Sequence, residues 1–556
     1  MATRRSRTPS TQKPSQNEHV PEMSPPAGKG RLSHSLTTAL LYAVSALAFS
    51  LAFPGFHDVW GIPVFAFVAL APAVLAIHRS NWFEAFGYGA LYGFVTYALH
   101  NYWLALFHPL TIFVVPGIYG AYFLVLIPVL KLAGHLMPRH GYLLQTLIWI
   151  AYEYLRTLGF LGYSYGVLGY SLYSYPLFIQ ISSLVGVWGV TAIAAFPSFY
   201  LGWAIREGFP WIRRHVTAGV AWAGILLLSL TGGLFLQVDY SDSPTKRLAL
   251  IQQNSDPWKG AELAYERALE ILIDQSTQAL EQEPDMVVWS ETAFVPSINY
   301  HQRYRTNPAM YDLVRELTEY LDTQTVPYVL GNAHAERRVD SDGDFFRVNY
   351  NAALLWNHGA VEETYRKVHL VPFTEHFPFE RQLPWMYQLL LDFDTHFWEK
   401  GDEYTVFEVD GMRFSTPICF EDTFGYLTRR FANDGAEFFI NVTNDAWSHS
   451  VPAAMQHLAM AVFRSVETRR SMARSTNAGM TALIDPNGRI LELARPFEAN
   501  HTVVDLPLYP ARDTGYMAVG DIMGQIALVS AGAWLLILVA LRVVRRFRDS
   551  ADRSDR

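Results

Sequence analysis

One cysteine in this chain stands where a predicted strand meets a predicted helix. Cys419 is the single cysteine among 556 residues, and it ends the apolar run "RFSTPIC". The next segment, "FEDTFGYLTRRFAND", can begin a helix at once. A thiol on such a turn is exposed, and the helix N-terminus favours its anion. We predict that Cys419 is a catalytic nucleophile. A small buried apolar residue is the alternative.

A thiol nucleophile requires a base to take its proton and a cation to stabilise developing negative charge. Glu291 follows an apolar run in "MVVWSETAF", and Lys367 and Glu375 lie in the aromatic segment "YRKVHLVPFTEHFPF". Each of these residues alone is typical of a solvated strand end. Their order along the chain, Glu then Lys then Cys, is more specific. We therefore predict that Glu291, Lys367 and Cys419 meet in one site.

The segments around these residues predict a layered α/β domain over 238–519. Interleaved strands and helices favour a sheet covered by helices, and "DPNGR" at 485–489 is a hairpin turn. There is no phosphate-binding or dinucleotide-binding glycine motif and no basic stripe for nucleic acid. Runs rich in Val, Ile and aromatic residues predict the strands "RLALIQQN", "DMVVWSE", "PYVLGNAHA", "NAALLWN", "FSTPICF", "EFFINVTND" and "MTALIDP". Helical spacing marks 259–282, 308–322, 422–434 and 452–472.

The remainder of the chain has the composition of a membrane protein. Over the whole chain apolar residues make up 51% and charged residues 17%, against about a quarter charged in soluble domains, and long apolar runs lie in residues 36–237. A spanning helix needs about 20 mostly apolar residues. Buried helices of a large soluble protein are the alternative. We predict eight spanning helices, seven before the α/β domain and one after it: 36–54, 60–78, 84–107, 111–131, 142–159, 177–205, 216–237 and 520–541.

Lysine and arginine alternate between the two sides of this predicted bundle. They occur in the N-terminal tail, in the second, fourth and sixth connections and after the last helix. The other three connections, 55–59, 108–110 and 160–176, contain neither residue. The positive-inside rule then places both termini in the cytoplasm and the α/β domain on the opposite side. The predicted organisation is a disordered basic tail (1–35), a seven-helix domain (36–237), the α/β domain (238–519), a last helix (520–545) and a cytoplasmic tail (546–556).

Two further segments are expected at the membrane surface. The connection 160–176 is rich in Gly, Tyr and Ser without charge, and we expect it to lie at the interface beneath the α/β domain. The segment "FPFERQLPWMYQLLLDF" at 377–393 either dips into lipid or forms a lid over the site. An amphipathic core helix is the competing interpretation of that segment.

Taken together, these motifs resemble the nitrilase superfamily, whose members carry a Glu–Lys–Cys triad on an α-β-β-α sandwich. With seven spans before that domain and one after it, the chain resembles the apolipoprotein N-acyltransferases over about residues 36–545. The resemblance implies a polytopic α-helical membrane domain joined to an α/β nitrilase-like α-β-β-α sandwich. It rests on "PDMVVWSETA", "YRKVHLVPFTEHFPF", "PICFED", "INVTNDAW" and "RSTNAGMTALIDPNG".

Carried over by position, the resemblance implies that Glu291 is the general base, Lys367 the oxyanion stabiliser and Cys419 the nucleophile. It implies neither a cofactor nor a metal. The supporting residues that the resemblance adds are Glu375, Glu421, Trp258 and Asn351. For Trp258, simple packing is the alternative.

Three residues depart from the family's pattern. Ser290 replaces the usual proline before the glutamate, and Phe420 replaces the common tyrosine after the cysteine. Ser448 lies in "DAWSHS", where an aromatic residue and glycine usually follow the tryptophan. None of these changes removes a triad member. Three polar residues of "INVTNDAW" are expected to fix a turn near the site rather than do chemistry: Asn441, Asn444 and Asp445.

The resemblance also implies a reaction. An acyl chain passes from a membrane phospholipid to the N-terminal amine of diacylglyceryl-cysteine apolipoproteins, through a thioester on Cys419. The implied location is the bacterial inner membrane, with the catalytic domain on the periplasmic side. The expected partners are phospholipid, apolipoprotein and bilayer, and not nucleic acid or metal. Two other functions stay open, a membrane-tethered amidase or nitrilase and a non-enzymatic membrane scaffold.

Overall fold

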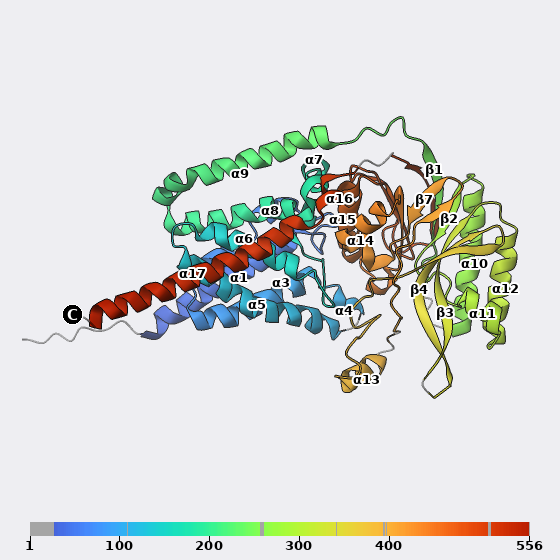
Figure 1. Cartoon of the computed structure of the whole chain (residues 1–556), viewed down its shortest axis with the longest axis horizontal. Coiled ribbons are helices and arrows are strands. Elements are labelled where there is room, and N and C mark those ends of the chain that lie inside the picture. The colour runs from blue at the N-terminus through green and yellow to red at the C-terminus, as the bar shows by residue number, and fades with distance from the viewer. Residues whose placement is uncertain are drawn as a thin grey trace, which may run out of the picture.

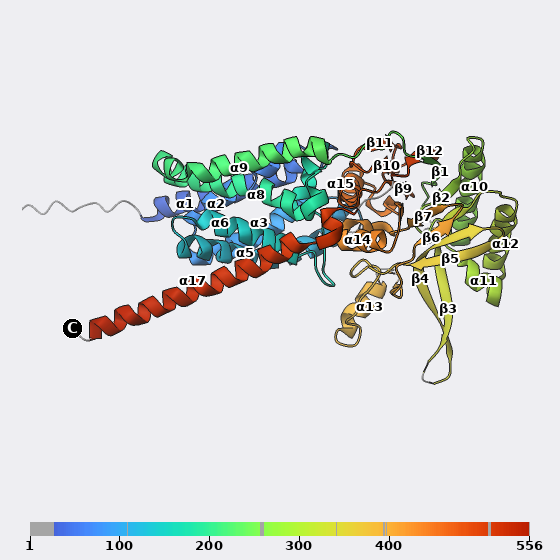
Figure 2. The same cartoon turned by 45° about the horizontal axis from the view of Figure 1, so that its top comes forward.

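The computed structural model describes residues 27–107, 109–255, 261–340, 342–392, 395, 397–509 and 513–554. The chain forms a bundle of apolar helices at one end and an α/β domain with two sheets at the other (Figure 1). The last long helix leaves the α/β domain and runs back along the bundle (Figure 2).

The bundle is built from long apolar stretches, because a helix satisfies its own backbone hydrogen bonds where water is absent. Close helix contacts depend on small residues: at Gly93 a Cβ atom would lie 2.6 Å from Tyr119 O on the neighbouring helix. The bundle elements are α1 (Ala27–Ala52), η1 (Pro63–Phe67), α2 (Ala71–Arg79), α3 (Trp82–His100), α4 (Leu104–Phe107), α5 (Thr111–Leu136), α6 (Gly141–Leu155), η2 (Leu168–Leu172), α7 (Pro176–Ile179), α8 (Ser182–Glu207), α9 (Phe209–Leu236), α16 (Gly515–Val519) and α17 (Ile522–Ser554).

Five helices in the described part of the chain are long and apolar enough to cross a membrane, fewer than the eight predicted. The predicted span 60–78 is divided between η1 and α2. The predicted span 142–159 is α6, which has only 15 residues. Helix α3 has 19 residues but includes Glu84, His100 and several glycines and tyrosines. The five helices are His34–Ala52, Thr111–Leu136, Ser182–Glu207, Phe209–Leu236 and Ile522–Ser550.

Both ends of the described chain lie at the end of the bundle that is far from the α/β domain (Figures 1 and 2). Helix α1 begins at Ala27, inside the range 1–35 that is predicted as a disordered tail. Residues 1–26, the rest of that predicted tail, lie outside the described residues. Helix α17 continues to Ser554, through most of the range predicted as the C-terminal tail.

Two six-stranded sheets form the centre of the α/β domain. Their strand orders are β12-β1-β2-β3-β4-β5 and β11-β10-β9-β8-β7-β6. In each sheet three consecutive strands are parallel and the outer strands are antiparallel. The strands are β1 (Thr245–Gln252), β2 (Met286–Trp289), β3 (Tyr328–Val339), β4 (Phe345–Asn357), β5 (Ala360–Arg366), β6 (Phe407–Val409), β7 (Met412–Ser415), β8 (Phe438–Thr443), β9 (Met472–Thr476), β10 (Ala482–Ile484), β11 (Ile490–Leu493) and β12 (Asn500–Pro507).

Every predicted strand overlaps an observed one, and the turn at 485–489 joins β10 to β11. Gly488 in this turn has φ 77°, a conformation that favours glycine. The sequence pattern does not predict β5, β6, β9, β11 or β12. Strands β5 and β11 are edge strands with many exposed residues, so they lack a clear apolar face.

Helices cover the outer face of each sheet, which gives the predicted α-β-β-α layers (Figures 1 and 2). The sheets contact each other directly, since Ser475 Oγ of β9 donates to Ile251 O and Val288 O at 3.2 Å. Helices α10 (Ala261–Leu280), α11 (Ile298–Tyr304) and α12 (Pro308–Asp322) cover the first sheet. Helices α14 (Gly425–Asn433) and α15 (Val451–Thr468) cover the second, and η3 (Cys419–Thr423), η4 (Ala446–Ser448) and α13 (Pro384–Asp392) complete the domain.

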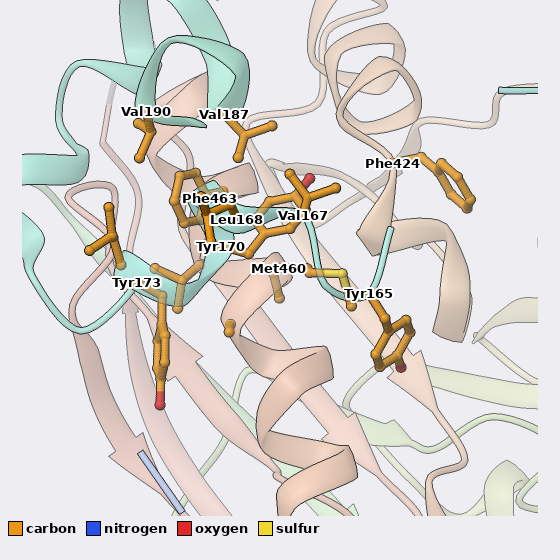
Figure 3. Close-up of a cluster of buried hydrophobic side chains, with 14 of the residues drawn as sticks. Tyr165, Val167, Leu168, Tyr170, Tyr173, Val187, Val190, Phe424, Met460 and Phe463 are labelled. Carbon is orange, nitrogen blue, oxygen red and sulfur yellow. The ribbon is translucent and has the colours of Figure 1, made fainter. Parts of the chain in front are cut away.

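Helix α15 joins the α/β domain to the bundle. Its Gln456 accepts a hydrogen bond from Trp103 Nε1 at 3.1 Å, and its Glu467 accepts one from the Val187 N–H at 3.0 Å. The connection 160–176 lies between the bundle and the α/β domain, which agrees with its predicted place beneath that domain. Figure 3 shows the apolar cluster that it forms with α8 and α15, which includes Tyr165, Val167, Leu168, Tyr170, Tyr173, Val187, Val190, Met460 and Phe463.

We predict that Arg469→Met weakens the attachment of the two domains. The Arg469 guanidinium donates to Gln180 Oε1 at 2.6 Å and to Leu236 O at 2.8 Å, and both acceptors belong to the bundle. Each charged hydrogen bond contributes about 1.5–3 kcal/mol. The apparent melting temperature of the full chain in detergent should therefore fall by several degrees. Arg315→Met, at a 56% exposed side chain, is the matched control and should melt like the unmodified chain. Equal melting of both variants would contradict this account of the interface.

Candidate active site

The predicted triad comes from three strand ends in the two sheets. Glu291 follows β2, Lys367 directly follows β5, and Cys419 opens η3 after β7. All three residues are buried, with 6%, 1% and 9% of their surfaces exposed, respectively. The face-to-face packing of the sheets brings these ends together, and the contacts below define the site.

The Lys367 ammonium lies between two carboxylates. Its Nζ is 3.1 Å from Glu291 Oε1 and 2.8 Å from Glu375 Oε1. Burial alone would lower the pKa of Lys367, but the negative charges of Glu291 and Glu375 outweigh it and raise the pKa well above its usual value. Lys367 is therefore a fixed positive charge that keeps its protons, suited to stabilising an anion rather than to acting as a base.

The Glu291 carboxylate is held at both of its oxygens. Oε1 accepts from Asn351 Nδ2 at 2.7 Å as well as from Lys367, and Oε2 accepts from the Asn444 N–H at 2.9 Å. Asn351 Nδ2 also donates to Glu375 Oε1 at 3.1 Å. The predicted base and the predicted supporting asparagine and glutamate thus share one hydrogen-bond network with the lysine.

Cys419 sits on a strained turn beside this network. Its φ of 50° is in the left-handed region, which is uncommon for residues other than glycine and recurs at functional sites. Burial raises the pKa of the Cys419 thiol well above its usual value; Glu291, Asp445 and Glu375 raise it further, and Lys367 lowers it. The thiol is therefore protonated at rest, so a reaction at the sulfur requires a base to take its proton. The expectation that this side chain is exposed is wrong, because the turn packs against the bundle.

Glu421 ties the lysine segment to the turn that carries the cysteine. Its Oε1 accepts from the Val368 and His369 N–H groups at 2.8 and 2.9 Å. Its Oε2 accepts from the Ile418 N–H at 2.8 Å, and the Tyr365 hydroxyl donates to both oxygens at 2.9 Å. Burial raises the pKa of Glu421 to about 7 although these donors oppose the shift. The predicted supporting residue therefore positions the backbone.

The polar residues of "INVTNDAW" shape turns, as predicted. Asn441 Nδ2 donates to Pro417 O at 3.1 Å, on the strand end before the cysteine. The backbone N–H of Asn444 reaches the base, a role that side-chain type cannot reveal. Among the departures from the family pattern, Ser290 Oγ donates to Gln253 Oε1 at 2.9 Å. Trp258 lies outside the described residues.

The other two departures also make packing contacts. The ring of Phe420 lies 4.9 Å from the ring of Phe424 and 6.5 Å from that of Tyr163, so it fills space between the turn and the bundle. Ser448 Oγ donates to Asp445 O at 3.0 Å within η4.

The segment 377–393 does not form a core helix. None of the residues of α13 is buried, and Trp385 is 64% exposed. The core-helix interpretation is therefore wrong. Helix α13 lies near the bundle end of the domain (Figure 2). Exposed apolar side chains of α13 and its approach are Phe379, Leu383, Trp385, Leu389 and Leu391.

Comparison with known proteins gives two family matches along the chain. A carbon–nitrogen hydrolase model matches residues 247–516, and a model described as the apolipoprotein N-acyltransferase N-terminal domain matches residues 45–200. The first match covers the α/β domain with its active site, and the second covers most of the bundle.

Curated relatives match over almost the whole chain. Apolipoprotein N-acyltransferase 1 of Treponema denticola is 40% identical over 532 residues, which are 91% of this chain and 97% of the relative. The protein of the same name from Treponema pallidum is 37% identical over 92% of this chain and 96% of its own length. Among solved structures, an amidase of the nitrilase superfamily from Nesterenkonia is 19% identical with a TM-score of 0.34; it covers 52% of this chain and 98% of its own.

We predict that Glu421→Gln slows the reaction of the Cys419 thiol with iodoacetamide. The amide nitrogen introduced by this change would face a backbone N–H, so two donors would meet. The side chain would also lose a charge-assisted hydrogen bond, which contributes about 1.5–3 kcal/mol, or about 10–150-fold in rate. Intact mass of the full chain measures the labelling. Glu408→Gln, at a 71% exposed side chain on β6, is the control. Labelling of Glu421→Gln at the rate of the control would rule out this positioning role.

Proposed function

This chain belongs to the apolipoprotein N-acyltransferase family, and from this premise we propose that it carries an acyl group from a membrane phospholipid on Cys419 to the N-terminal amine of lipoproteins. The chain is an acyltransferase of lipoprotein biosynthesis with a carbon–nitrogen hydrolase domain. The proposal concerns the donor, the covalent intermediate and the residues that act.

One observation carries the residue assignments: a buried ammonium lies between two carboxylates beside the chain's single thiol. The contacts of Lys367 with Glu291 and Glu375 support the assignment of Glu291 as the base, because they hold its carboxylate in a fixed orientation away from solvent. The raised pKa of Cys419 supports a resting thiol that ionises only as the base takes its proton. Such an arrangement suits acyl transfer, because the negative charge forms next to a fixed cation.

In the first half of the proposed reaction, Glu291 accepts the thiol proton as Cys419 Sγ attacks the carbonyl carbon of a phospholipid ester. Lys367 and a backbone N–H stabilise the resulting oxyanion. The carbon–oxygen bond of the ester then breaks, and Glu291 returns the proton to the leaving oxygen. The products are a lysophospholipid and an acyl thioester on Cys419.

In the second half, the α-amine of a diacylglyceryl-cysteine lipoprotein attacks the thioester carbonyl. Glu291 accepts a proton from the attacking nitrogen, and Lys367 again stabilises the oxyanion. The carbon–sulfur bond breaks, the sulfur regains a proton from Glu291, and the amide product leaves. The burial of the site supports a thioester that lasts until the amine arrives, because excluding water protects the thioester from hydrolysis.

The arrangement of the chain supports a site at the membrane surface. The catalytic domain lies at one end of the bundle and both described chain ends lie at the other. With the distribution of Lys and Arg, this supports cytoplasmic termini and a periplasmic catalytic domain in the inner membrane. We further propose that η1 with α2, α3 and α6 complete an eight-span bundle, as short spans packed among the five long helices.

The other functions considered from the sequence are less well supported. A tethered amidase needs no bundle of this size, and the full-length relatives carry acyltransferase names. A scaffold has no use for a buried Glu–Lys pair beside a thiol, because a buried ion pair must overcome the cost of removing two charges from water.

We predict that Cys419→Ala and Cys419→Ser remain in the membrane but lose N-acylation by a factor on the order of 10⁴ or more, because the thioester cannot form. Mass spectrometry of a diacylated lipoprotein incubated with each variant in membranes measures the triacylated product. Ser550→Ala, at the exposed far end of α17, is the control and should be fully active. Normal activity in either cysteine variant would refute the nucleophile.

We also predict that phospholipid alone leaves an acyl group on Cys419. Intact mass should rise by one acyl chain, and hydroxylamine should remove it because thioesters are labile to this amine. Lys367→Met should slow the acylation strongly, while Lys246→Met, at a partly exposed lysine on β1, should not. An active enzyme that never gains the acyl mass would contradict the two-step scheme.

A further inference from the structure

A second cluster of charged residues lies behind the cysteine turn and takes no part in the chemistry proposed above. Asp422 is on η3, Asp445 follows β8, His457 is on α15 and Arg474 is on β9. Each of the four is at most 2% exposed. Buried charges of this kind are costly unless each finds a partner of opposite sign.

Each carboxylate in this cluster contacts both cations. His457 Nε2 is 2.8 Å from Asp422 Oδ1, and Nδ1 is 3.1 Å from Asp445 Oδ1. Arg474 donates to Asp422 and also to Asp445 Oδ2, the latter at 3.2 Å. Arg474 Nη2 also lies 2.8 Å from His457 Nδ1.

Protonated His457 makes this cluster neutral. Burial and Arg474 lower the pKa of His457, but Asp422 and Asp445 outweigh them and raise it to about 9. Two carboxylates then face two cations. The ring of Tyr165 lies 6.2 Å from the imidazole.

The cluster connects the two turns that carry the reacting groups. Asp422 is three residues after Cys419 on the same η3 turn. Asp445 directly follows Asn444, whose N–H holds the base Glu291. Residue 479 has to be glycine for this arrangement, because a Cβ there would lie 2.4 Å from Asp445 Oδ2.

The charge of the cluster also reaches the thiol. Asp445 raises the pKa of Cys419, and Arg474 interacts electrostatically with the same sulfur. Other charged or titratable groups that act on the sulfur include Glu291, Glu375, Lys367 and Tyr165. Because Glu291 and Glu375 together exceed the charge of Lys367, any further net negative charge opposes the thiolate.

We propose that His457 and Arg474 are positioning residues for the acyl transfer, which neutralise Asp422 and Asp445 and so hold the thiol turn against the base turn without opposing thiolate formation. The role in acyl transfer rests on the proposed function. The effect on the thiol does not, because it concerns ionisation of the sulfur before any substrate binds.

The test is the pH profile of iodoacetamide labelling of the full-length chain in detergent, read by intact mass. Cys419 is the only thiol, so the label reports one site. His457→Gln leaves one uncompensated negative charge and should slow labelling about tenfold at a given pH, which displaces the profile to higher pH. Asp445→Asn removes a negative charge and should speed labelling about tenfold. The double variant is neutral again and should return close to the unmodified profile.

Gln456→Leu is the matched control, because it removes buried hydrogen bonds from the same helix without changing charge. It should lower the melting temperature but leave the labelling profile in place. If His457→Gln behaves like this control and leaves the profile unmoved, the proposal is overturned. If His457→Gln does not fold, the isosteric Asp445→Asn decides alone: faster labelling supports the proposal, and unchanged or slower labelling overturns it.

The outcome is separable from failure of the proposed function. An unmodified chain that fails to acylate lipoprotein while the two variants shift labelling in opposite directions would refute the function and support the electrostatic role. An active chain whose variants show no shift in labelling would support the proposed function and refute the electrostatic role.

Discussion

The Lys367 ammonium is almost entirely removed from water, and this burial constrains everything around it. An unpaired buried ammonium would lose several kcal/mol of solvation, so carboxylates must meet it from two directions. Glu291 arrives from the end of β2 and Glu375 from the segment after β5. Both carboxylates belong to the sheet that carries Lys367, and the second sheet is tied to them by the Asn444 N–H, which donates to the other oxygen of Glu291. The thiol, the base and the cation are then consequences of one packing arrangement.

A series of buried polar contacts connects the site to the helix bundle. Glu421 fixes the lysine segment to the cysteine turn, and the cluster around His457 fixes that turn to α15. Helix α15 is in turn bonded to the bundle through Gln456 and Glu467. A rigid connection between the site and the bundle suits the proposed reaction, in which both substrates are anchored in lipid, because it fixes the position of the thiol relative to the bundle. The unburied apolar α13 lies outside this rigid core, where it can meet lipid.

Much of this architecture can be predicted from the sequence, for identifiable reasons. Apolar strands such as β2 and β8 have strong patterns, and the order of Glu291, Lys367 and Cys419 indicates the triad before any contact is known. Helix α12 matches its predicted bounds because its caps are clear: Asn307 accepts from the Met310 N–H and Pro308 opens the helix.

Other features depend on tertiary contacts that a linear pattern does not contain. The predicted span 142–159 extends beyond helix α6, which ends at Leu155, and edge strands β5 and β11 lack an apolar face. Charged residues are usually solvated, so nothing in the sequence marks His457 and Arg474 as buried partners. Residue type cannot predict that the backbone N–H of Asn444 donates to Glu291. The turn pattern by itself predicts an exposed Cys419, because it contains no sign of the bundle that covers the turn.

The most direct test of the central claim is a cryo-electron microscopy structure of the acylated enzyme in a lipid nanodisc. The account predicts an acyl chain joined to Cys419 Sγ, with Lys367 Nζ still within hydrogen-bond distance of Glu291 and Glu375 and directed at the thioester oxygen. An acyl group on any other residue, or a Lys367 side chain turned away from both carboxylates, would contradict it.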